Sequence, residues 1–593
     1  MEPLQELTFI NDLIFKRKEL IKIHPEILFW WRRPCVVKTL LVTDGILDFG
    51  MGDFGLQTFV NVLVNDGRSY VRFELTLAHL RNNVSDAQVM TGMSGVTRSI
   101  KGFRFDNPAH FKPDMYDEVW MFGFETNFRQ PSYADRVAKP ASVYPAARLG
   151  DAELTALSSH MNRGGGVFAT GDHGFLGNAL CGSVNRVRSM RHWGDFFNAG
   201  QNEVGMDNPR RNDTNLIGHD AGSQFSDQSD DIPQILDLKL YSSPVNFFRV
   251  ARYPHPVLCS RFGRINVFPD HPHEGECREP ASLLETYSFD GSEEYPPESG
   301  GGPRVSPEII ARSRVPAGND ARGSKQPTLG HSFGAISAYD GQRAGVGRVV
   351  CDATWHHFVN VNLIGVVEGG IFDEFKNVGE SATKHDGFMS SAAGQAVLAK
   401  IKEYYVNIGV WIAPPERHDC FHSRLWLDVV FADRIMEATL LSPDTTFMSI
   451  RPETFLSIGI HARDVLDRRA SQCQTLSWVL GWLKMVWAEV IIQIDPWEPW
   501  PIRPPRPPLP WYDLQPLIDV ALGGALVAVR QQFPYPAEGM DEKAFDESVR
   551  VAASGARRAL DVALKEAIID HRALGRLFTE ASRSITAGLA QAD

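Results

Sequence analysis

Short apolar runs rich in β-branched residues alternate with segments of helical spacing over roughly the first 415 residues, and this alternation most constrains the fold. The run at 36–43 ends at Asp44-Gly45, residues 54–64 have helical spacing, and a second apolar run covers 70–77. Alternating strands and helices are typical of a parallel sheet that is covered by helices. The sequence therefore predicts an α/β domain over residues 36–415.

The same patterns place the remaining elements of the chain. Further strands are predicted at 116–124, 167–170, 264–268, 331–339 and 348–353, and helices at 151–162 and 394–407. Asp151 is predicted to cap the helix that begins there, with Glu153 in its first turn. Beyond residue 420 only helical spacing is found, at 425–438, 476–494, 514–532 and 541–589. Residues 416–593 are thus predicted to form a helical C-terminal region, and residues 1–35 a helical extension.

Two segments interrupt these patterns. Residues 280–330 are rich in Gly, Pro, Ser and charge, which predicts a mobile insertion. Residues 496–510 hold eight prolines, which predicts a polyproline-type spacer. The alternative for this second segment is a motif recognised by aromatic-lined grooves.

Charge, cysteine content and hydropathy exclude several classes of protein. A net charge of −12 and a pI near 5.9 give no basic face for nucleic acid. Seven cysteines are too few for a disulfide scaffold, so reduced thiols in a cytoplasmic protein are expected. No membrane segment is evident, because Lys484 and Glu489 interrupt the longest apolar segment. No secretory signal is evident either, because charged residues interrupt the apolar residues of 1–22.

The segment at 164–177, GGGVFATGDHGFLG, is a short strand, a sharp glycine turn and a helix start. It resembles the nucleophile elbow of class I glutamine amidotransferase-like proteins, where the turn reads Gly-x-Cys-x-Gly. Asp172 stands at the cysteine position here, and Cys181 lies nine residues further on. The resemblance therefore implies the fold but not a cysteine-dependent glutaminase, and Cys181 is not expected to be a nucleophile.

The segment at 347–357, GRVVCDATWHH, is similar to the last strand of the ThuA-like branch of that superfamily, where a Gly-Arg-Val strand leads to a histidine. The three glycines before Val167 and the opening strand fit the same branch. The resemblance spans about residues 36–410. It implies a flavodoxin-like, mainly parallel sheet with helices on both faces, and it favours a polar small-molecule substrate such as a sugar or an amide.

A third segment, PDHPHEGEC at 269–277, places imidazole and carboxylate groups close together. These are the ligands of hydrolytic Zn, Fe and Mn sites, so His271, His273 and Glu276 are candidate metal ligands. The run is equally consistent with a polar loop whose side chains are hydrogen-bonded. No Walker loop and no Gly-x-Gly-x-x-Gly turn is present, so no nucleotide cofactor is expected.

Three segments with histidines, at His173, His271 and His356, follow predicted strand ends, where ligands collect in open α/β sheets. We therefore expect them to converge, although any one Asp-His pair alone is consistent with a solvated turn. The predicted catalytic residues are Asp172, His173, His356 and His357, with Asp172 as general base or metal ligand. The predicted substrate-binding residues are Asp44 and Arg188. The alternative for Asp44 is an ordinary loop residue, and the alternative for Arg188 is a solvated helix face.

Together these features predict a hydrolase that acts on a polar small molecule through a His/Asp/Glu site, with or without a divalent metal. The alternative is a catalytically inactive ligand-binding or assembly scaffold on the same fold. In that case the helical C-terminal region and the proline spacer would contact a protein partner or a second copy of the chain.

Overall fold

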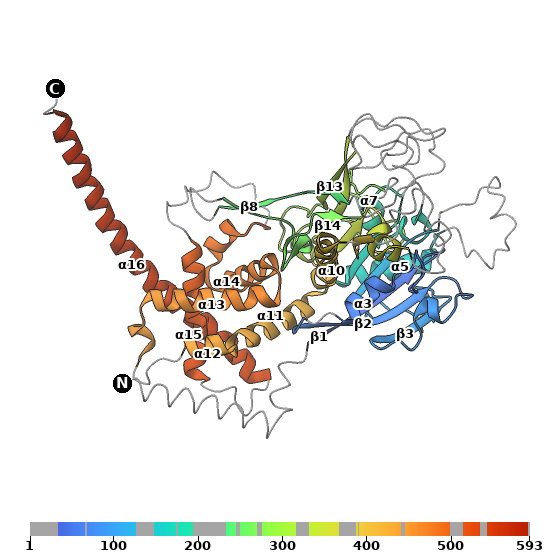
Figure 1. Ribbon diagram of the computed structural model, residues 1–593, viewed down its shortest axis with the longest axis horizontal. Helices are drawn as coiled ribbons and strands as arrows, with labels where there is room; N and C mark the ends of the chain where they lie inside the picture. The colour runs from blue at the N-terminus through green and yellow to red at the C-terminus, as the bar shows by residue number, and fades with distance from the viewer. Residues whose placement is uncertain are drawn as a thin grey trace, which may run out of the picture. The chain divides into compact units, whose positions relative to one another are not determined.

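The computed structural model describes residues 34–65, 68–125, 148–172, 176–193, 233–244, 250–269, 275–315, 331–366, 387–389, 391–439, 445–497, 514–533 and 542–590. The chain divides into two compact units (Figure 1). The first, which we call the α/β unit, comprises Pro34–Leu240 and Pro254–Phe421. The second, the helical unit, comprises Met1–Arg33, Tyr241–Tyr253 and His422–Asp593. The predicted N-terminal extension lies almost wholly outside the described residues.

The α/β unit is built on a nine-stranded sheet of order β3-β2-β1-β4-β5-β15-β14-β13-β7. The parallel strands are β1 (Cys35–Thr43), β2 (Val71–His79), β3 (Val96–Lys101), β4 (Glu118–Phe122), β5 (Gly166–Thr170) and β15 (Val349–Asp352). The antiparallel edge is made of β14 (His331–Tyr339), β13 (Glu308–Val315) and β7 (Asp237–Leu238). The predicted α/β fold with a mainly parallel sheet is confirmed. The run β2-β1-β4-β5-β15 has the strand order of flavodoxin, with β3 added at its edge.

Helices cover both faces of this sheet because side chains alternate along each buried strand. The covering helices are α3 (Gln57–Asn65), α5 (Asp151–Asn162) and α10 (Ala392–Ile412). On β4, Met121 shares one buried core with Leu157 of α5. Its neighbour Trp120 faces the other way, with its ring 5.5 Å from that of Phe59 of α3. Phe59 in turn lies 5.1 Å from the ring of Tyr405 of α10.

The register of the parallel strands brings their carboxyl ends to one level. His79 pairs with Thr43, Thr43 with Phe122, Phe122 with Thr170, and Thr170 with Asp352. Each of these residues ends its strand. The loops that follow β2, β1, β4, β5 and β15 therefore begin side by side along one edge, which we call the carboxyl edge.

Short elements complete the α/β unit. They are η1 (Ala87–Val89), α6 (Asn178–Cys181), α7 (Val187–Met190), β6 (Gln234–Ile235), η3 (Pro256–Leu258), β10 (Cys259–Ser260), β11 (Gly263–Arg264), β12 (Val267–Phe268), η4 (Gly341–Ala344), η5 (Trp355–His357), α9 (Asn360–Ile364) and η8 (Gly387–Met389). Of the helix caps, α5 differs from prediction. Gly150 rather than Asp151 is its N-cap, and the Glu153 carboxylate accepts the Gly150 N–H at 2.9 Å.

The segment predicted as a mobile insertion is folded over its described part, 280–315. Tyr287, Glu294 and Tyr295 are fully buried, and β13 pairs along β14 inside the sheet. The glycines and prolines shape tight turns between these anchors, so composition alone gave a wrong picture of this part. Residues 316–330 lie outside the described residues.

The helical unit confirms the predicted helical C-terminal region. Its elements are the hairpin β8 (Tyr241–Pro244) and β9 (Val250–Tyr253), η9 (Phe447–Ser449), α12 (Asp433–Ala438), α13 (Pro452–Arg469), α14 (Gln472–Ile494), α15 (Gln515–Gln532) and α16 (Glu542–Ala590); α11 (Pro415–Val430) contains the boundary between the units. The sequence did not predict α13. A Cβ on Gly459 of α13 would lie 1.8 Å from the Asp519 carbonyl oxygen of α15, so these helices cross closely. Most of the predicted proline spacer lies outside the described residues.

None of the helices in the described ranges is both long enough and apolar enough to cross a membrane.

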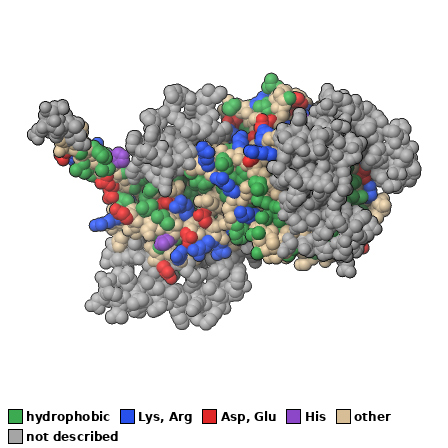
Figure 2. Space-filling model, turned by 45° about the horizontal axis from the view of Figure 1, so that its top comes forward, with side chains coloured by type: hydrophobic (Ala, Val, Ile, Leu, Met, Phe, Trp, Pro, Cys, Tyr) green, Lys and Arg blue, Asp and Glu red, His purple; other side chains and the backbone are tan. Residues whose placement is uncertain are grey.

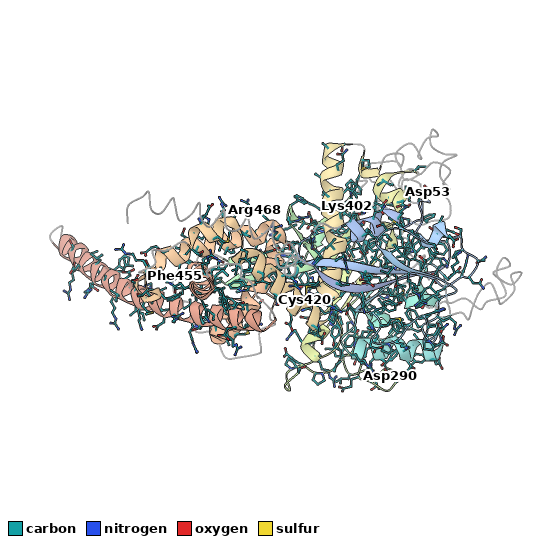
Figure 3. All side chains as sticks on the ribbon, turned by 90° about the horizontal axis from the view of Figure 1, so that it is seen from below. Asp53, Asp290, Lys402, Cys420, Phe455 and Arg468 are labelled. Carbon is teal, nitrogen blue, oxygen red and sulfur yellow. A yellow bond between two sulfur atoms is a disulfide. The ribbon has the colours of Figure 1, made fainter. Side chains whose placement is uncertain are left out.

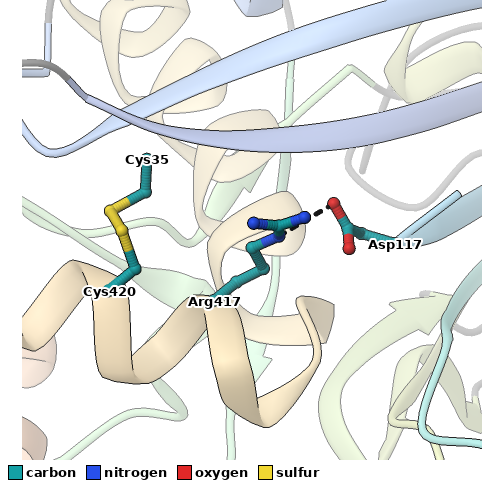
Figure 4. Close-up of a disulfide and its surroundings, with 4 residues drawn as sticks. All are labelled: Cys35, Asp117, Arg417 and Cys420. Carbon is teal, nitrogen blue, oxygen red and sulfur yellow. Dashed lines mark hydrogen bonds and ion pairs between the residues drawn. A yellow bond between two sulfur atoms is a disulfide. The ribbon is translucent and has the colours of Figure 1, made fainter.

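A disulfide joins Cys35, at the start of β1, to Cys420 in α11, with 6.0 Å between the two Cα atoms (Figures 3 and 4). Beside it, Arg417 Nε donates a hydrogen bond to Asp117 Oδ2 at 3.0 Å. The prediction that every cysteine is reduced is wrong for this pair. The two thiols are 385 residues apart in sequence, and only the packing of α11 against the start of β1 brings them together. The remaining cysteines are free and buried: Cys181, Cys259, Cys277, Cys351 and Cys473.

Replacing both Cys35 and Cys420 by serine should lower the free energy of unfolding of the α/β unit by about 2–4 kcal/mol, because the crosslink restricts the unfolded chain. Urea unfolding followed by tryptophan fluorescence measures this change. A reductant should move the wild-type midpoint to that of the variant and leave the variant unmoved. Equal midpoints for the two proteins under oxidising conditions would contradict the prediction.

Candidate functional site

The loops after β5 and β15 place a carboxylate beside an imidazole at the carboxyl edge. Asp172 Oδ2 lies 3.7 Å from His356 Nε2, and both side chains are almost completely buried, with 1% and 2% of their surface exposed. This separation is longer than a direct hydrogen bond. The two groups therefore face each other within ion-pair distance.

Neighbouring polar groups fix each member of this pair. Thr354 Oγ1 donates a hydrogen bond to Asp172 Oδ1 at 2.7 Å. Thr354 Oγ1 also accepts the main-chain N–H of His356 at 3.1 Å and so caps η5. His356 Nδ1 lies 2.7 Å from Asn362 Oδ1. Because an amide oxygen can only accept, Nδ1 carries the proton. The other ring nitrogen, Nε2, is the one that faces Asp172.

The next histidine belongs to a separate buried group. His357 Nδ1 lies 2.8 Å from Asp352 Oδ1, and its Nε2 lies 3.1 Å from the Gln234 amide nitrogen. Tyr404 of α10 donates its hydroxyl to Asp352 Oδ2 at 2.7 Å. His357 was predicted as catalytic together with His356, but its ring contacts Asp352 and Gln234 instead of Asp172. These bonds tie β15 to α10.

Arg191 joins the two loops that carry the pair. Its guanidinium is fully buried and donates to the main-chain carbonyls of Asp172 (2.7 Å), Ala353 (2.6 Å) and Asp352 (3.2 Å). Burial lowers the pKa of Arg191 from its ordinary value. The guanidinium donates hydrogen bonds to carbonyls at the ends of β5 and β15. It thereby fixes the position of Asp172 relative to the β15 loop.

The turn before Asp172 requires a glycine. A Cβ on Gly171 would lie 2.4 Å from the Leu176 carbonyl oxygen, too close for any other residue. The Gly171 carbonyl also accepts the Trp355 N–H at 2.9 Å, which draws the two loops together. Trp355 in turn stacks on the His356 ring with 4.2 Å between centroids.

Asp44 lies at the topological switch point, between β1 and β4, where open α/β sheets bind ligands. Its Oδ1 accepts the N–H groups of Phe124 and Glu125, and its buried Oδ2 has no hydrogen-bond partner among the described residues. Burial, and then the Glu125 carboxylate, raise the pKa of Asp44 to about 7, against the lowering effect of the two N–H groups. The rings of Phe124 and Trp355, 6.0 Å apart, lie between Asp44 and the His356 ring.

The other predicted residues fall in three groups. His173, His271 and His273 lie outside the described residues. Glu276 is half-buried, and its carbonyl accepts the His192 N–H at 2.8 Å, next to Arg191. Arg188 lies elsewhere, because its guanidinium pairs with Glu294 at 2.7 Å and with Glu285 at 3.1 Å.

Within the described ranges, no group of three His, Cys, Asp or Glu side chains is suited to hold a metal ion. Glu276 is the one predicted ligand that the structure describes. It lies on the strand-like stretch that bridges Arg191 through Cys277, beside the loops of the carboxyl edge. The imidazole and carboxylate groups of His271, His273 and Glu276 are donor types that fit a divalent metal.

Cys181, which is not expected to be a nucleophile, lies in the buried core of the α/β unit. Its thiol is fully buried and faces the carbonyl oxygens of Met121 and Thr170 at 3.9 and 3.8 Å. Burial, and then the Asp44 carboxylate, raise the pKa of Cys181 well above its ordinary value. A protonated, buried thiol is a poor nucleophile.

Several residues of the site were not predicted from sequence: Thr354, Asn362, Asp352, Gln234 and Tyr404. Thr354 and Asp352 lie in the segment that drew attention to the histidines, so a search for side chains that orient an imidazole could have found them. Gln234 and Tyr404 lie more than forty residues away in sequence from their partners. Nothing in local spacing points to those two.

The α/β unit also has an open pocket of about 550 Å³ between α3, α10 and the turn that joins β10 to β11. Lys402, labelled in Figure 3, and Arg261 are on its wall, and Glu403 pairs there with Arg261 and, at 2.7 Å, with Arg68. Neither Asp172 nor His356 lines this pocket.

No protein-family model and no curated protein matches the chain. Among solved structures, a cytoplasmic protein from Salmonella typhimurium is similar at 12% sequence identity and a TM-score of 0.23, over 64% of this chain and 100% of its own. A likeness of that size carries no argument about fold or function.

The raised pKa of Asp44 predicts a pH-dependent stability. Folded Asp44 holds its proton up to about pH 7 while the unfolded side chain loses it near 3.8, so Asp44 lowers stability as pH rises between these values. Asp44→Asn removes this effect. Its stability relative to wild type should rise by about 2 kcal/mol between about pH 5.5 and pH 8, since each pH unit is worth about 1.4 kcal/mol.

Urea unfolding at both pH values measures this difference. Asp114→Asn, which alters an exposed carboxylate, is the control and should show no such trend. A constant stability difference between Asp44→Asn and wild type would mean that Asp44 is ionised throughout.

Proposed function

We propose that the chain is a hydrolase whose acid–base pair is Asp172 and His356, acting on a polar small molecule. The observation that carries the proposal is the 3.7 Å approach of Asp172 Oδ2 and His356 Nε2, with the far atoms of both groups already bonded to Thr354 and Asn362. Two titratable groups held 3.7 Å apart at the carboxyl edge of an open sheet are suited to proton transfer.

The geometry supports a simple division of labour. Asp172 Oδ2 accepts a proton from a water molecule as the water oxygen bonds to the electrophilic carbon of the substrate. His356, protonated on both nitrogens, then gives its Nε2 proton to the leaving group as the bond to that group breaks. The Nδ1–H bond to Asn362 orients the ring throughout. Arg191 holds the main chain of Asp172 in place, and Thr354 holds its carboxylate.

The proposal includes a divalent metal ion at the site. His271, His273 and Glu276 would hold Zn, Mn or Fe, and such an ion would lower the pKa of a bound water molecule. Elemental analysis of the purified protein tests this part. The resemblance at the elbow and at the last strand favours a sugar or an amide as substrate.

A cytoplasmic location is also a proposal. Buried free thiols such as Cys181 and Cys351 are common in reducing compartments, whereas the Cys35–Cys420 bond is more typical of oxidising ones. Alkylation of thiols during cell lysis, followed by mass spectrometry, reports whether Cys35 and Cys420 are reduced in the cell.

The burial of the pair supports a second candidate function. With 1% and 2% of their surfaces exposed, Asp172 and His356 would serve as structural groups of a catalytically inactive scaffold. The two functions differ in what a substitution does to stability. A structural pair loses stability when one partner is removed, whereas a catalytic pair loses mainly activity.

Asp172→Asn and His356→Gln should each reduce hydrolytic turnover by about 10²–10⁴-fold, the usual contribution of a general acid or base. Turnover is measured on a panel of chromogenic esters, amides and glycosides. Cys181→Ser is the matched control, since it alters a buried neighbour of the site and should keep its activity. Absence of turnover on the panel, together with a stability loss of more than about 1 kcal/mol in both variants, would favour the scaffold.

A further inference from the structure

The longest helix of the helical unit, α16, is packed along its first part only. A Cβ on Gly524 of α15 would lie 2.3 Å from the Ala559 Cβ, and one on Gly555 would lie 2.4 Å from the Ala528 Cβ, so the two helices approach closely there. The stripe of α16 that faces this contact is buried and consists of Ala552, Ala556, Ala559, Leu560 and Ala563. The packing ends near Ala563.

The apolar character of α16 continues past that point in side chains that are exposed. Leu574, Leu577 and Phe578 are 47%, 61% and 71% exposed, and Ile568 is 51% exposed. Figure 1 shows this half of α16 running beyond the other helices of its unit, and Figure 2 shows green hydrophobic side chains on its surface. Monomeric proteins rarely leave a continuous apolar stripe of this kind in solvent.

A row of positions that contains the exposed Leu574 and Phe578 and the half-buried Leu564 and Ala567 has the spacing of a helix-packing seam. Its positions are separated alternately by three and four residues, in line with the buried stripe before them: Leu564, Ala567, His571, Leu574, Phe578 and Ala581. Such a seam faces one partner helix along its whole length. Ile569 lies on the opposite side of the helix, although it is also 61% exposed.

Charge is segregated along the same half of the helix. Residues 561–570 carry Asp561, Glu566 and Asp570 against one lysine. Residues 572–583 carry Arg572, Arg576 and Arg583 against one glutamate. A second such helix in the same direction would place like charges together, whereas one in the opposite direction would place acidic residues beside basic ones.

The sizes of the seam residues favour the same orientation. In an antiparallel pair that sets His571 beside Leu574 of the other copy, Phe578 faces Ala567 and Leu564 faces Ala581. Each layer then combines a large side chain with a small one, or two of medium size, which fills space evenly. A parallel pair would stack Phe578 on Phe578 and Ala567 on Ala567.

We propose that α16 is the interface of a homodimer, formed by the antiparallel pairing of residues 564–581 with the same residues of a second copy. The seam supplies its own complement in both size and charge when it is reversed, which is the property of a two-fold symmetric interface. This assignment is independent of the hydrolytic site.

Light scattering coupled to size-exclusion chromatography of the full chain tests the dimer. Wild type should have twice the mass of the 66.1 kDa chain, and Leu574→Glu combined with Phe578→Glu should have the single mass. Ile569→Glu, on the opposite side of α16, is the matched control and should stay dimeric. Circular dichroism checks that every variant keeps its helix content.

A monomeric wild type at concentrations on the order of 50 µM, where a stable homodimer would persist, would overturn the proposal. So would a double variant that keeps the wild-type mass, or a control that dissociates equally.

Cysteine crosslinking tests the orientation. In the antiparallel pair, Phe578→Cys should form a disulfide with Ala567→Cys in a mixture of the two variants. Phe578→Cys alone should not crosslink, because its two copies lie about 16 Å apart along the helix at about 1.5 Å per residue. A disulfide formed by Phe578→Cys alone would show a parallel pair and overturn the assignment.

Discussion

The fully buried guanidinium of Arg191 is the interaction on which the candidate site depends. It bonds to carbonyls of the loops after both β5 and β15, and these carbonyls would otherwise be buried without a donor. The β5 loop carries Asp172 and the β15 loop carries His356. By bonding to both loops, Arg191 fixes the position of Asp172 relative to His356. The hydrogen bonds of this guanidinium among the described residues go to main-chain carbonyls.

The parallel sheet and the strand-end position of the site could be predicted from sequence, because apolar runs that stop at Asp44, at Gly171-Asp172 and at Asp352 mark the carboxyl edge. Their common level follows from the strand register, which the runs do not specify. The divergence of His356 and His357 was not predictable, since it depends on Asn362, Gln234 and Tyr404. The folding of residues 280–315 was missed because buried Tyr287 and Tyr295 stand among turn-forming residues.

The chain combines two ways of using buried polar groups. At the carboxyl edge, the buried Asp44 Oδ2 has no hydrogen-bond partner among the described residues, and Asp172 Oδ2 lies 3.7 Å from His356 Nε2. Around Asp352 and His357 the polar groups satisfy one another and tie the last parallel strand to α10. The first group contains the proposed acid–base pair and the second connects two elements of the fold, although adjacent histidines belong to both.

The ¹⁵N spectrum of the His356 ring tests the acid–base pair most directly. Among the 18 histidines, its signals are those missing from His356→Gln in protein labelled at histidine. The account predicts a ring protonated at Nδ1, with an Nε2 signal that moves when Asp172 is replaced by asparagine. A ring protonated only at Nε2, with signals that do not respond to Asp172→Asn, would contradict it.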